Sequence, residues 1–379
     1  MKSILIVAGE SSGDKYGAEV VREFKKRHAD AVFFGLGGER LAGQGVELSA
    51  SLDELNVVGI FEVLGRLPRL RRTFRRLEKE GKTRRPAAAV LIDSPDFNLR
   101  LAKRLSRSGI PVLYYISPTV WAWRRGRLKT IRKYVTRMCL IFPFEKRIYD
   151  ESGISAVSVG HPLKGQVRAR LSQADFRARY SLAPQGPLVT LLPGSRRSEI
   201  KNHLPVLLEA AHRLRADLPV QFLLVLAETI DRDYLHRFLP RDEPGIQVLI
   251  KDGYEAMAHS DLVLTSCGTA TLETALLGTP LIAFYRLSPL TYYPFRRLIR
   301  VRSYSIVNIL AGKRVVPELI QRRFTAPELA REARALLLSE EKKAAMREEF
   351  RRIAGRLGEG RAAEGVAREL EKIVFPCQA

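Results

Sequence analysis

The chain has 379 residues, which is too long for one ordinary hydrophobic core and indicates two domains of nearly equal size. Its 64 Lys and Arg against 41 Asp and Glu leave a formal net charge of +23, which favours an anionic partner: a nucleic acid, an anionic membrane surface or a phosphorylated substrate. The sequence offers neither a secretory signal nor a membrane span, and three dispersed cysteines argue against a disulfide framework or a zinc site. We therefore expect a cytosolic protein, or one on the cytosolic side of a membrane.

Short β-branched runs alternate with longer helical patterns along the chain. Continuous apolar strands separated by helices predict parallel sheets that are covered on both faces. The segment 181–187 is the best linker, so we predict an α/β protein with two facing, doubly wound Rossmann-like domains, residues 1–180 and 188–379. The predicted strands are Ile4–Val7, Val32–Phe34, Ala89–Ile92, Val112–Ile116, Cys139–Phe142, Val157–Val159, Val189–Leu192, Phe222–Leu226, Val248–Ile250, Leu262–Thr265 and Leu281–Phe284.

Ligands of such sheets bind beyond the carboxyl ends of the strands, so those ends are the places to examine. The first strand ends in the loop AGESSGD, residues 8–14. This loop lacks the Gly-Lys-Ser/Thr of a phosphate loop and the spacing of GxGxxG. We expect it to hold some other ligand against the N-terminus of the following helix.

The strand Ala89–Ile92 ends in a stretch with two carboxylates. Asp93 follows the apolar strand directly, where burial should raise its pKa and suit it to act as a general base. Asp96 precedes a helical pattern, so capping that helix is its more ordinary role and catalysis the alternative. His161, in the turn GHPL after the last strand of the first half, is a secondary candidate catalyst beside its more ordinary structural role.

Two strand ends of the second half look suited to phosphate. In LLPGSR, Gly194 and Ser195 offer backbone N–H groups and Arg196 a bidentate cation, although a plain turn would look the same. In LTSCGTATLE, the helix start after Gly268 points its dipole at the loop, and Glu273 follows one turn later, either to accept from ribose hydroxyls or only to favour the helix dipole. The pair favours a nucleotide diphosphate. The acidic pair of 231–233 has no other acidic cluster beside it, so we expect no metal.

Eight motifs in register resemble the lipid-A-disaccharide synthase family over Val7 to about Gln321. They are AGESSGD, LIDSPDFN, YYISPTVWAWR, FPFE, VGHPL, LLPGSRRSEI, CGTATLE and LLGTPLI. The resemblance implies the GT-B glycosyltransferase architecture and an inverting transfer from UDP-2,3-diacylglucosamine to 2,3-diacylglucosamine 1-phosphate. The products would be a β-1,6-linked disaccharide 1-phosphate and UDP. No cofactor is implied, because the UDP-sugar is itself a substrate.

The resemblance also implies roles for particular residues. Asp93 would be the general base, Arg196 would neutralise the leaving group, and Asn308 would hold a donor-sugar hydroxyl or a phosphate oxygen, unless it only closes its loop. Glu318 and Gln321 are secondary candidates. Cys267, Thr119 and Val307 depart from the family pattern. The expected UDP-binding residues are Gly194, Ser195, Arg196, Ser266, Gly268, Thr269, Ala270, Thr271 and Glu273, and the expected acceptor-binding residues are Gly9, Glu10, Ser11, Ser12, Gly13 and Asp14.

Two basic stretches, 66–85 and 290–300, mix arginines with apolar side chains. Each is either a solvated helix face or a segment attracted to anionic lipid, and a substrate with fatty chains favours the second interpretation. We expect the chain to bind peripherally to the cytosolic face of the inner membrane. Two other functions stay open: a UDP-N-acetylglucosamine epimerase-like enzyme, and a basic nucleic-acid-binding protein. We expect no nucleic-acid partner, because no base-stacking or groove-reading module is found.

Overall fold

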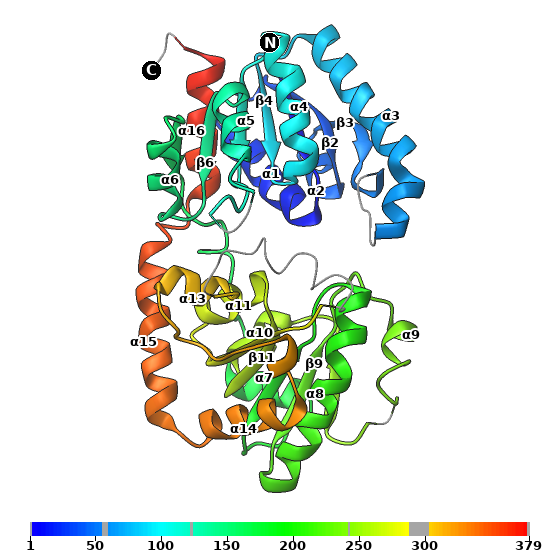
Figure 1. The fold of residues 1–379 in the computed structure, drawn as a ribbon, viewed down its shortest axis with the longest axis vertical. Coiled ribbons are helices and arrows are strands. Elements are labelled where there is room, and N and C mark those ends of the chain that lie inside the picture. The colour runs from blue at the N-terminus through cyan, green and yellow to red at the C-terminus, as the bar shows by residue number, and fades with distance from the viewer. Residues whose placement is uncertain (1, 55–59, 122–123, 242, 288–302, 377–379) are drawn as a thin grey trace. The chain divides into compact units, whose positions relative to one another are not determined.

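The structure is a computed structural model that describes residues 2–54, 60–121, 124–241, 243–287 and 303–376 (Figure 1). It divides into two compact units. The first unit comprises Met1–Lys164 together with Leu357–Ala379, and the second is Gly165–Arg356. Across the described ranges, no helix combines the length and the apolar character that crossing a membrane requires.

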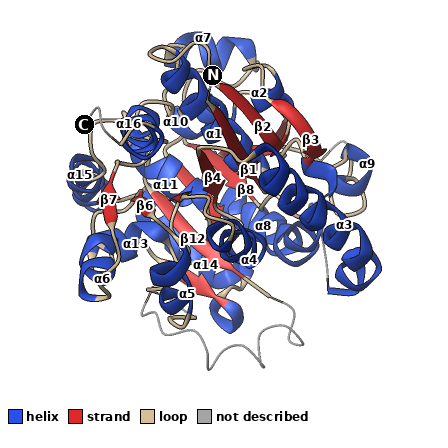
Figure 2. Ribbon diagram, turned by 90° about the horizontal axis from the view of Figure 1, so that it is seen from above, coloured by secondary structure: helices blue, strands red, loops and turns tan. Residues whose placement is uncertain are grey.

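The first unit is built on a seven-stranded parallel sheet in the order β3-β2-β1-β4-β5-β6-β7 (Figure 2). The central strands are continuous apolar runs because helices cover both faces of the sheet, so residues of both orientations are buried. The strands are β1 (Ser3–Ala8), β2 (Val32–Gly37), β3 (Glu47–Ser51), β4 (Ala88–Ile92), β5 (Val112–Tyr115), β6 (Arg137–Leu140) and β7 (Ala156–Ser158).

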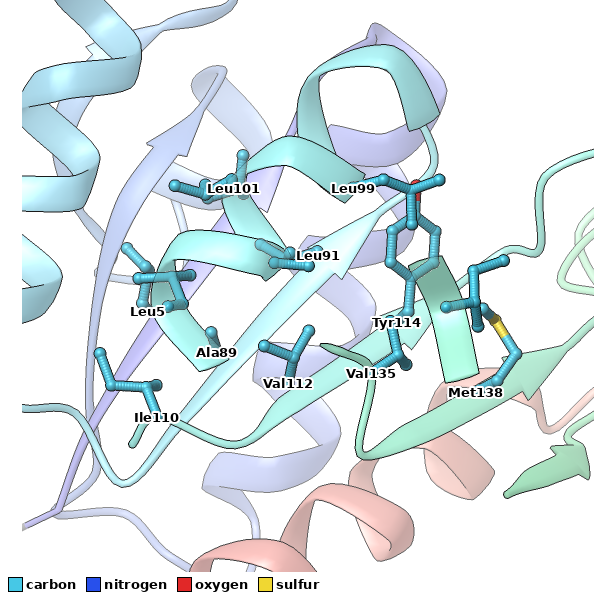
Figure 3. Close-up of a cluster of buried hydrophobic side chains, with 14 of the residues drawn as sticks. Leu5, Ala89, Leu91, Leu99, Leu101, Ile110, Val112, Tyr114, Val135 and Met138 are labelled. Atoms are coloured by element: carbon cyan, nitrogen blue, oxygen red, sulfur yellow. The ribbon is translucent and has the colours of Figure 1, made fainter. Parts of the chain in front are cut away.

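Helices α1 and α16 pack against each other, and α4 packs against α3 and α5. Buried side chains of the sheet and of α4, among them Leu5, Leu91, Leu101 and Tyr114, form an apolar core (Figure 3). The helices of this unit are α1 (Ser11–Lys25), α2 (Glu39–Ala42), α3 (Ile60–Arg84), α4 (Pro95–Arg107), α5 (Arg127–Tyr134), α6 (Glu145–Glu151) and α16 (Ala362–Val374), and a 3₁₀ turn covers Leu52–Glu54.

The second unit has a six-stranded parallel sheet in the order β10-β9-β8-β11-β12-β13. Its strands are β8 (Leu188–Leu192), β9 (Gln221–Val225), β10 (Ile246–Leu249), β11 (Leu262–Ser266), β12 (Leu281–Tyr285) and β13 (Glu318–Ile320). Its helices are α7 (Gln173–Arg179), α8 (Arg197–Asp217), α9 (Arg232–Leu235), α10 (Gly253–Ala258), α11 (Thr269–Leu276), α13 (Ile306–Ala311), α14 (Ala326–Leu337) and α15 (Glu340–Arg356), with a 3₁₀ turn at Gln321–Arg323.

The two doubly wound sheets confirm the predicted fold class, but the predicted domain limits, 1–180 and 188–379, differ from the observed units. Residues 165–180 belong to the second unit, because Phe176 of α7 packs into its core and the backbone N–H of Arg170 donates to Glu255. The last helix, α16, belongs to the first unit. It packs on α1 and beside β4 and β5, and Glu369 pairs with Arg137 at 2.7 Å.

Candidate active site

The strands of the first sheet are all parallel, so β1, β4, β5 and β6 end at the same edge. The predicted loop AGESSGD follows β1 there, and the structure separates its residues into two groups. Glu10, Ser11 and Ser12 are exposed at the start of α1. Gly9, Gly13 and Asp14 are buried. Only the exposed three are placed where a ligand could contact their side chains.

Asp14 is a correction to the predicted acceptor-binding set. Its carboxylate accepts hydrogen bonds from the backbone N–H groups of Gly38 at 2.7 Å, Arg40 at 3.1 Å and Leu41 at 3.2 Å. These groups belong to the N-terminus of α2, whose amides lack partners within the helix. Asp14 is only 4% exposed. It therefore stabilises the start of α2 and is not available to a sugar.

Asp93 lies one residue beyond β4 and is half-buried. Burial, and to a smaller extent the carboxylate of Glu10, raise its pKa to about 6, against the lowering effects of the Ser94 backbone N–H and the Arg127 guanidinium. The backbone at Asp93 and at Ser94 is left-handed, with φ of 50° and 42°. Two consecutive residues other than glycine in this region are uncommon and costly. Asp93 thus has the environment predicted for a general base.

Asp96 does not cap α4, contrary to the more ordinary role considered for it. The helix begins at Pro95, its N-cap residue is Ser94, and Asp96 lies in the first turn. The Asp96 carboxylate accepts from Arg124 at 2.8 Å and from Arg127 at 2.7 Å. Because the Asp96 side chain is 71% exposed, these ion pairs add little to stability. Their effect is to tether two cations beside Asp93.

Two buried residues that the sequence reasoning missed hold the backbone at Asp93. The amide of Asn98 donates to the carbonyl oxygens of Ile92 at 3.0 Å and Asp93 at 2.9 Å. The Tyr114 hydroxyl also donates to the carbonyl oxygen of Asp93, at 2.5 Å. Both residues stand in motifs that supported the resemblance, and that was the available signal. Their hydrogen-bond partners could not be read from the sequence.

Glu145 is a second group that the sequence reasoning missed, although it ends the motif FPFE. It is 1% exposed, and burial raises its pKa to about 7. Its Oε1 accepts from the Ser117 hydroxyl at 2.7 Å and from Trp121 Nε1 at 3.2 Å. The Tyr149 hydroxyl donates to Ser117 at 3.0 Å. This network fixes the loop after β5 to the start of α6.

His161 has the surroundings of a structural residue. It is 4% exposed, and burial lowers its pKa to about 4. Its Nδ1 accepts from the backbone N–H of Leu163 at 3.2 Å, and its own backbone N–H donates to the carbonyl of Leu357 at 2.9 Å. These contacts support the turn role and leave the imidazole poorly suited to proton transfer near neutral pH.

In the second unit, the loop after β8 differs from the prediction in one respect. Glu199 Oε2 accepts from the backbone N–H groups of Ser195 at 2.9 Å and Arg196 at 3.2 Å. A carboxylate of the chain itself therefore occupies the N–H groups that were expected to bind phosphate. Gly194 has φ of 127°, and a Cβ there would lie 2.4 Å from Glu199, so the glycine serves this internal contact. The Arg196 side chain is exposed.

The loop after β11 has the opposite character. Gly268 and Thr269 are exposed. Gly268 is the N-cap residue of α11 and has no side chain with which to cap the helix. A Cβ at Gly268 would meet no atom within 4 Å. Ser266 and Thr271 are buried, and the Thr271 hydroxyl donates to the carbonyl of Gly268 at 2.7 Å. This open helix start is the better place for an anion.

Three further predicted positions lie near that loop. Glu273, on the second turn of α11, accepts from the Tyr254 hydroxyl at 2.9 Å and is half-buried. Ala270 is also half-buried, on the first turn. Cys267, which departs from the family pattern, has its thiol pKa raised by burial. The thiol therefore stays protonated at neutral pH.

Asn308 is a clear correction, because its side-chain amide has no hydrogen-bonding capacity left for a substrate. Its Oδ1 accepts from the backbone N–H groups of Val315 at 2.7 Å and Val316 at 2.9 Å. Its Nδ2 donates to the carbonyl of Val316 at 3.0 Å and to Glu318 at 2.8 Å. An amide makes four hydrogen bonds, and all four are used in a residue that is 1% exposed. Asn308 closes its own loop.

The two secondary candidates beside Asn308 are also engaged with backbone. Glu318 Oε1 accepts from the backbone N–H of Ser305 at 2.9 Å and from its hydroxyl at 2.8 Å, at the start of α13. The Gln321 side-chain amide, in the orientation that gives both its nitrogen and its oxygen a partner, bonds the backbone of Leu287. The amide nitrogen donates to the Leu287 carbonyl at 3.3 Å, and the amide oxygen accepts from the Leu287 N–H at 3.0 Å. Val307, another departure from the family pattern, is fully buried in α13.

Asp231 caps α9, because its carboxylate accepts from the backbone N–H of Asp233 at 2.9 Å. Within the described ranges no group of three His, Cys, Asp or Glu side chains is arranged to hold a metal ion. The basic stretch 290–300 lies outside the described residues. In the stretch 66–85, Arg69, Arg72 and Lys79 are exposed on α3, whereas Leu77 is buried and Phe74 packs edge-on against Phe97. This segment is therefore an amphipathic helix with a basic outer face.

Comparison with known proteins decides the family. The family model described as lipid-A-disaccharide synthetase matches residues 4–369. The chain belongs to this family. It is 43% identical over 377 residues to the lipid-A-disaccharide synthase of Myxococcus xanthus, covering 98% of each chain. It is 44% identical over 368 residues to that of Syntrophus aciditrophicus, covering 97% of this chain and 96% of the relative. The chain is accordingly a glycosyltransferase of lipid A biosynthesis that uses a sugar nucleotide and a lipid-linked sugar.

Solved structures share the fold at low sequence identity. The structure of Staphylococcus aureus MnaA with UDP has a TM-score of 0.69 at 12% identity, covering 99% of this chain and 97% of that chain. The calicheamicin glycosyltransferase CalG4 has a TM-score of 0.63 at 14% identity over all of both chains. A UDP-GlcNAc 2-epimerase from Neisseria meningitidis has a TM-score of 0.66 at 10% identity, covering 99% of this chain and all of that chain. These likenesses show the fold, and the family membership excludes the epimerase and nucleic-acid interpretations.

Proposed function

We propose that the chain transfers 2,3-diacylglucosamine from UDP-2,3-diacylglucosamine to 2,3-diacylglucosamine 1-phosphate, forming a β-1,6-linked disaccharide 1-phosphate and UDP. Membership of the family over residues 4–369 is the observation on which this proposal rests. In the reaction, O6 of the acceptor bonds to the anomeric carbon while the bond from that carbon to the diphosphate breaks. The proton of the acceptor hydroxyl goes to a base, and UDP leaves. The configuration at the anomeric carbon is inverted.

Asp93 is the proposed general base. Its raised pKa, about 6, lies close to neutral pH, so the carboxylate is mostly ionised in the cell and still basic enough to accept a proton in the transition state. The exposed residues Glu10, Ser11 and Ser12 are proposed to contact the acceptor sugar at the same edge of the sheet. Arg124 and Arg127, tethered by Asp96, are proposed to attract the acceptor phosphate.

The proposed UDP site is the open helix start at Gly268–Thr271, together with the Arg196 side chain. Gly268 and Thr269 are exposed at the start of α11, where the helix dipole favours a diphosphate. The guanidinium can neutralise the leaving group as charge develops on it. Glu273 is proposed to accept from ribose hydroxyls. Because these groups supply positive charge, we propose that the reaction needs no metal ion.

We propose further that the chain acts at the cytosolic face of the inner membrane, bound through basic and apolar side chains. The exposed arginines of α3 support this proposal, since each basic side chain near an anionic surface contributes about 1 kcal/mol. Acylated substrates would reach the enzyme from the same surface. Sedimentation with vesicles that contain anionic lipid, compared with zwitterionic vesicles, tests the attraction.

Product analysis tests the function itself. The purified chain is incubated with the two acylated sugars, with and without a chelator, and the products are separated by mass. We expect a disaccharide 1-phosphate and one equivalent of UDP in both samples. An isomerised sugar nucleotide without disaccharide would overturn the assignment. Activity lost with the chelator and restored by magnesium would overturn only the metal-free part of the proposal.

A further inference from the structure

The carbonyl oxygen of Asp93 accepts two hydrogen bonds from fully buried side chains on neighbouring elements. Tyr114, on β5, donates its hydroxyl at 2.5 Å, and Asn98, on α4, donates its amide at 2.9 Å. The backbone N–H of Asp93 in turn donates to the carbonyl of Tyr115 at 2.9 Å. The peptide groups on both sides of the Asp93 side chain are therefore fixed by the interior of the unit.

The two hydrogen bonds to the Asp93 carbonyl hold a backbone segment of unusual conformation. Asp93 and Ser94 both have positive φ, and Pro95 follows, which further restricts Ser94. Such a conformation persists only where the surroundings hold it in place. An extended backbone after β4 would instead direct the Asp93 side chain elsewhere, because successive residues of a strand point to opposite faces.

We propose that Tyr114 and Asn98 are positioning residues that hold the Asp93 carboxyl at the edge of the sheet by fixing its main-chain carbonyl. The proposal rests on the proposed role of Asp93 as the base. Charged and titratable groups that act on this region come from several elements: Glu10 next to α1, Arg127 at the start of α5, Asp96 on α4, Tyr149 on α6 and Tyr114 itself. Losing one of the two donors should let the carboxyl turn towards water.

The chain offers a matched pair of tyrosines for the test. Tyr114 and Tyr115 are adjacent on β5 and are both fully buried. The Tyr115 hydroxyl has no hydrogen-bond partner among the described residues, whereas that of Tyr114 bonds Asp93. The ring of Tyr114 lies in the core cluster with Leu99, Val135 and Met138 (Figure 3), and phenylalanine would keep this packing. In Tyr114→Phe, the Asp93 carbonyl also keeps its bond from Asn98.

The experiment measures kcat and KM of the full chain from pH 5 to 9 for Tyr114→Phe and Tyr115→Phe. We expect Tyr114→Phe to lower kcat about 10- to 100-fold, in line with the cost of a small misplacement of a reacting group, with KM for the UDP-sugar unchanged. The acidic limb of its profile should move to lower pH, because a carboxyl that reaches water loses the burial that raises its pKa. Tyr115→Phe should match the unchanged protein both in kcat and in the position of the acidic limb. Equal behaviour of the two variants overturns the proposal, as does a lower kcat with an unmoved acidic limb.

A second measurement separates this inference from the assignment of the base. The carboxyl of Asp93 is titrated by carbon NMR, with its signal identified from its absence in Asp93→Asn. If Asp93→Asn keeps full activity, the base assignment fails, and the NMR titration then tests the positioning alone. A lower pKa of Asp93 in Tyr114→Phe, but not in Tyr115→Phe, supports the positioning role of Tyr114. An identical titration in both variants overturns it.

Discussion

Oε2 of Glu199 lies 2.9 Å from the backbone nitrogen of Ser195. The same carboxylate accepts from Arg196, and the Tyr285 hydroxyl donates to its other oxygen at 2.9 Å. The chain thus supplies its own anion to the first turn of α8, as a helix N-terminus requires. The loop looks like a phosphate site in the sequence because the same N–H groups would serve either purpose. Because Glu199 occupies these N–H groups, the group that this loop can still offer to a substrate is the Arg196 side chain.

The first prediction contrasts these two neighbours. Arg196→Ala should lower kcat by about 10²–10³-fold, the usual effect of losing one group that stabilises developing charge, with an unchanged melting temperature. Glu199→Ala should instead lower the free energy of unfolding by about 1 kcal/mol or more, because it uncaps α8. Thermal unfolding and initial rates of both variants check this. Equal losses of stability would place Arg196 among the structural residues.

The second prediction concerns Asp93→Asn. Removing the base should lower kcat by about 10²–10⁴-fold and leave UDP affinity intact. In the unchanged protein, activity should fall as pH decreases through about 6, because the base works only when it is deprotonated and its pKa is raised to that value. Rates from pH 5 to 8 and calorimetric titration with UDP check both statements. A variant with normal turnover would show that another group accepts the proton.

The third prediction uses the empty space beside Gly268. A Cβ there meets no atom within 4 Å, so Gly268→Ala should fold normally. If the diphosphate approaches this backbone, the added methyl group should weaken UDP binding at least tenfold, which corresponds to about 1.4 kcal/mol. Gly355→Ala, on α15, is the control, since its Cβ also meets open space. The same UDP affinity in both variants would move the diphosphate away from α11.

The fourth prediction follows from the saturated amide of Asn308. Asn308→Ala should leave the N–H groups of Val315 and Val316 without their acceptor, at about 1–3 kcal/mol for each buried group. We therefore expect a melting temperature lower by several degrees, with UDP affinity of the folded protein retained. Scanning calorimetry and UDP titration below the transition check it. Lost activity at unchanged stability would restore the catalytic role predicted from the resemblance.

The fifth prediction concerns Glu145, whose pKa is raised by burial from 4.5 to about 7. A carboxyl with a raised pKa in the folded state destabilises the fold as pH rises from 4.5 to 7, because the unfolded chain releases its proton first. The cost is on the order of 3 kcal/mol at pH 8. Glu145→Gln should therefore gain stability relative to the unchanged protein between pH 5 and pH 8. Glu151→Gln, exposed on the same helix, should show no such trend.

Most of the fold could be predicted because each buried strand is a continuous apolar run, as Ile4–Val7 illustrates. Two short strands could not. Strand β3 has the sequence ELSAS with little apolar pattern, and β13 has three residues. The helix α16 shows an amphipathic pattern, but nothing in that pattern says which sheet its apolar face covers. Contacts between distant segments decide this.

The candidate site shows the same division. Asp93 could be predicted, because a carboxylate directly after a buried strand is visible in the sequence together with the physical reason for its raised pKa. Asn308 was misassigned because its four hydrogen bonds depend on where residues 315–318 return to it. Asp14 and the phosphate-binding role of the loop at Ser195 were misread for a related reason. In each case a carboxylate of the chain accepts from the backbone N–H groups at a helix N-terminus, and the sequence does not distinguish such an internal acceptor from a ligand.

The position of α16 has a consequence for how the chain is made. Residues 165–356 form one uninterrupted unit, whereas the first unit needs both residues 1–164 and the segment that follows 356. On the ribosome, the second unit can finish folding while β4 and β5 of the first sheet still lack the helix that covers them. Until α16 emerges, apolar surface of α1 and of these strands stays exposed to water. Translation stalled shortly before residue 357 should therefore yield nascent chains that recruit chaperones through their N-terminal half.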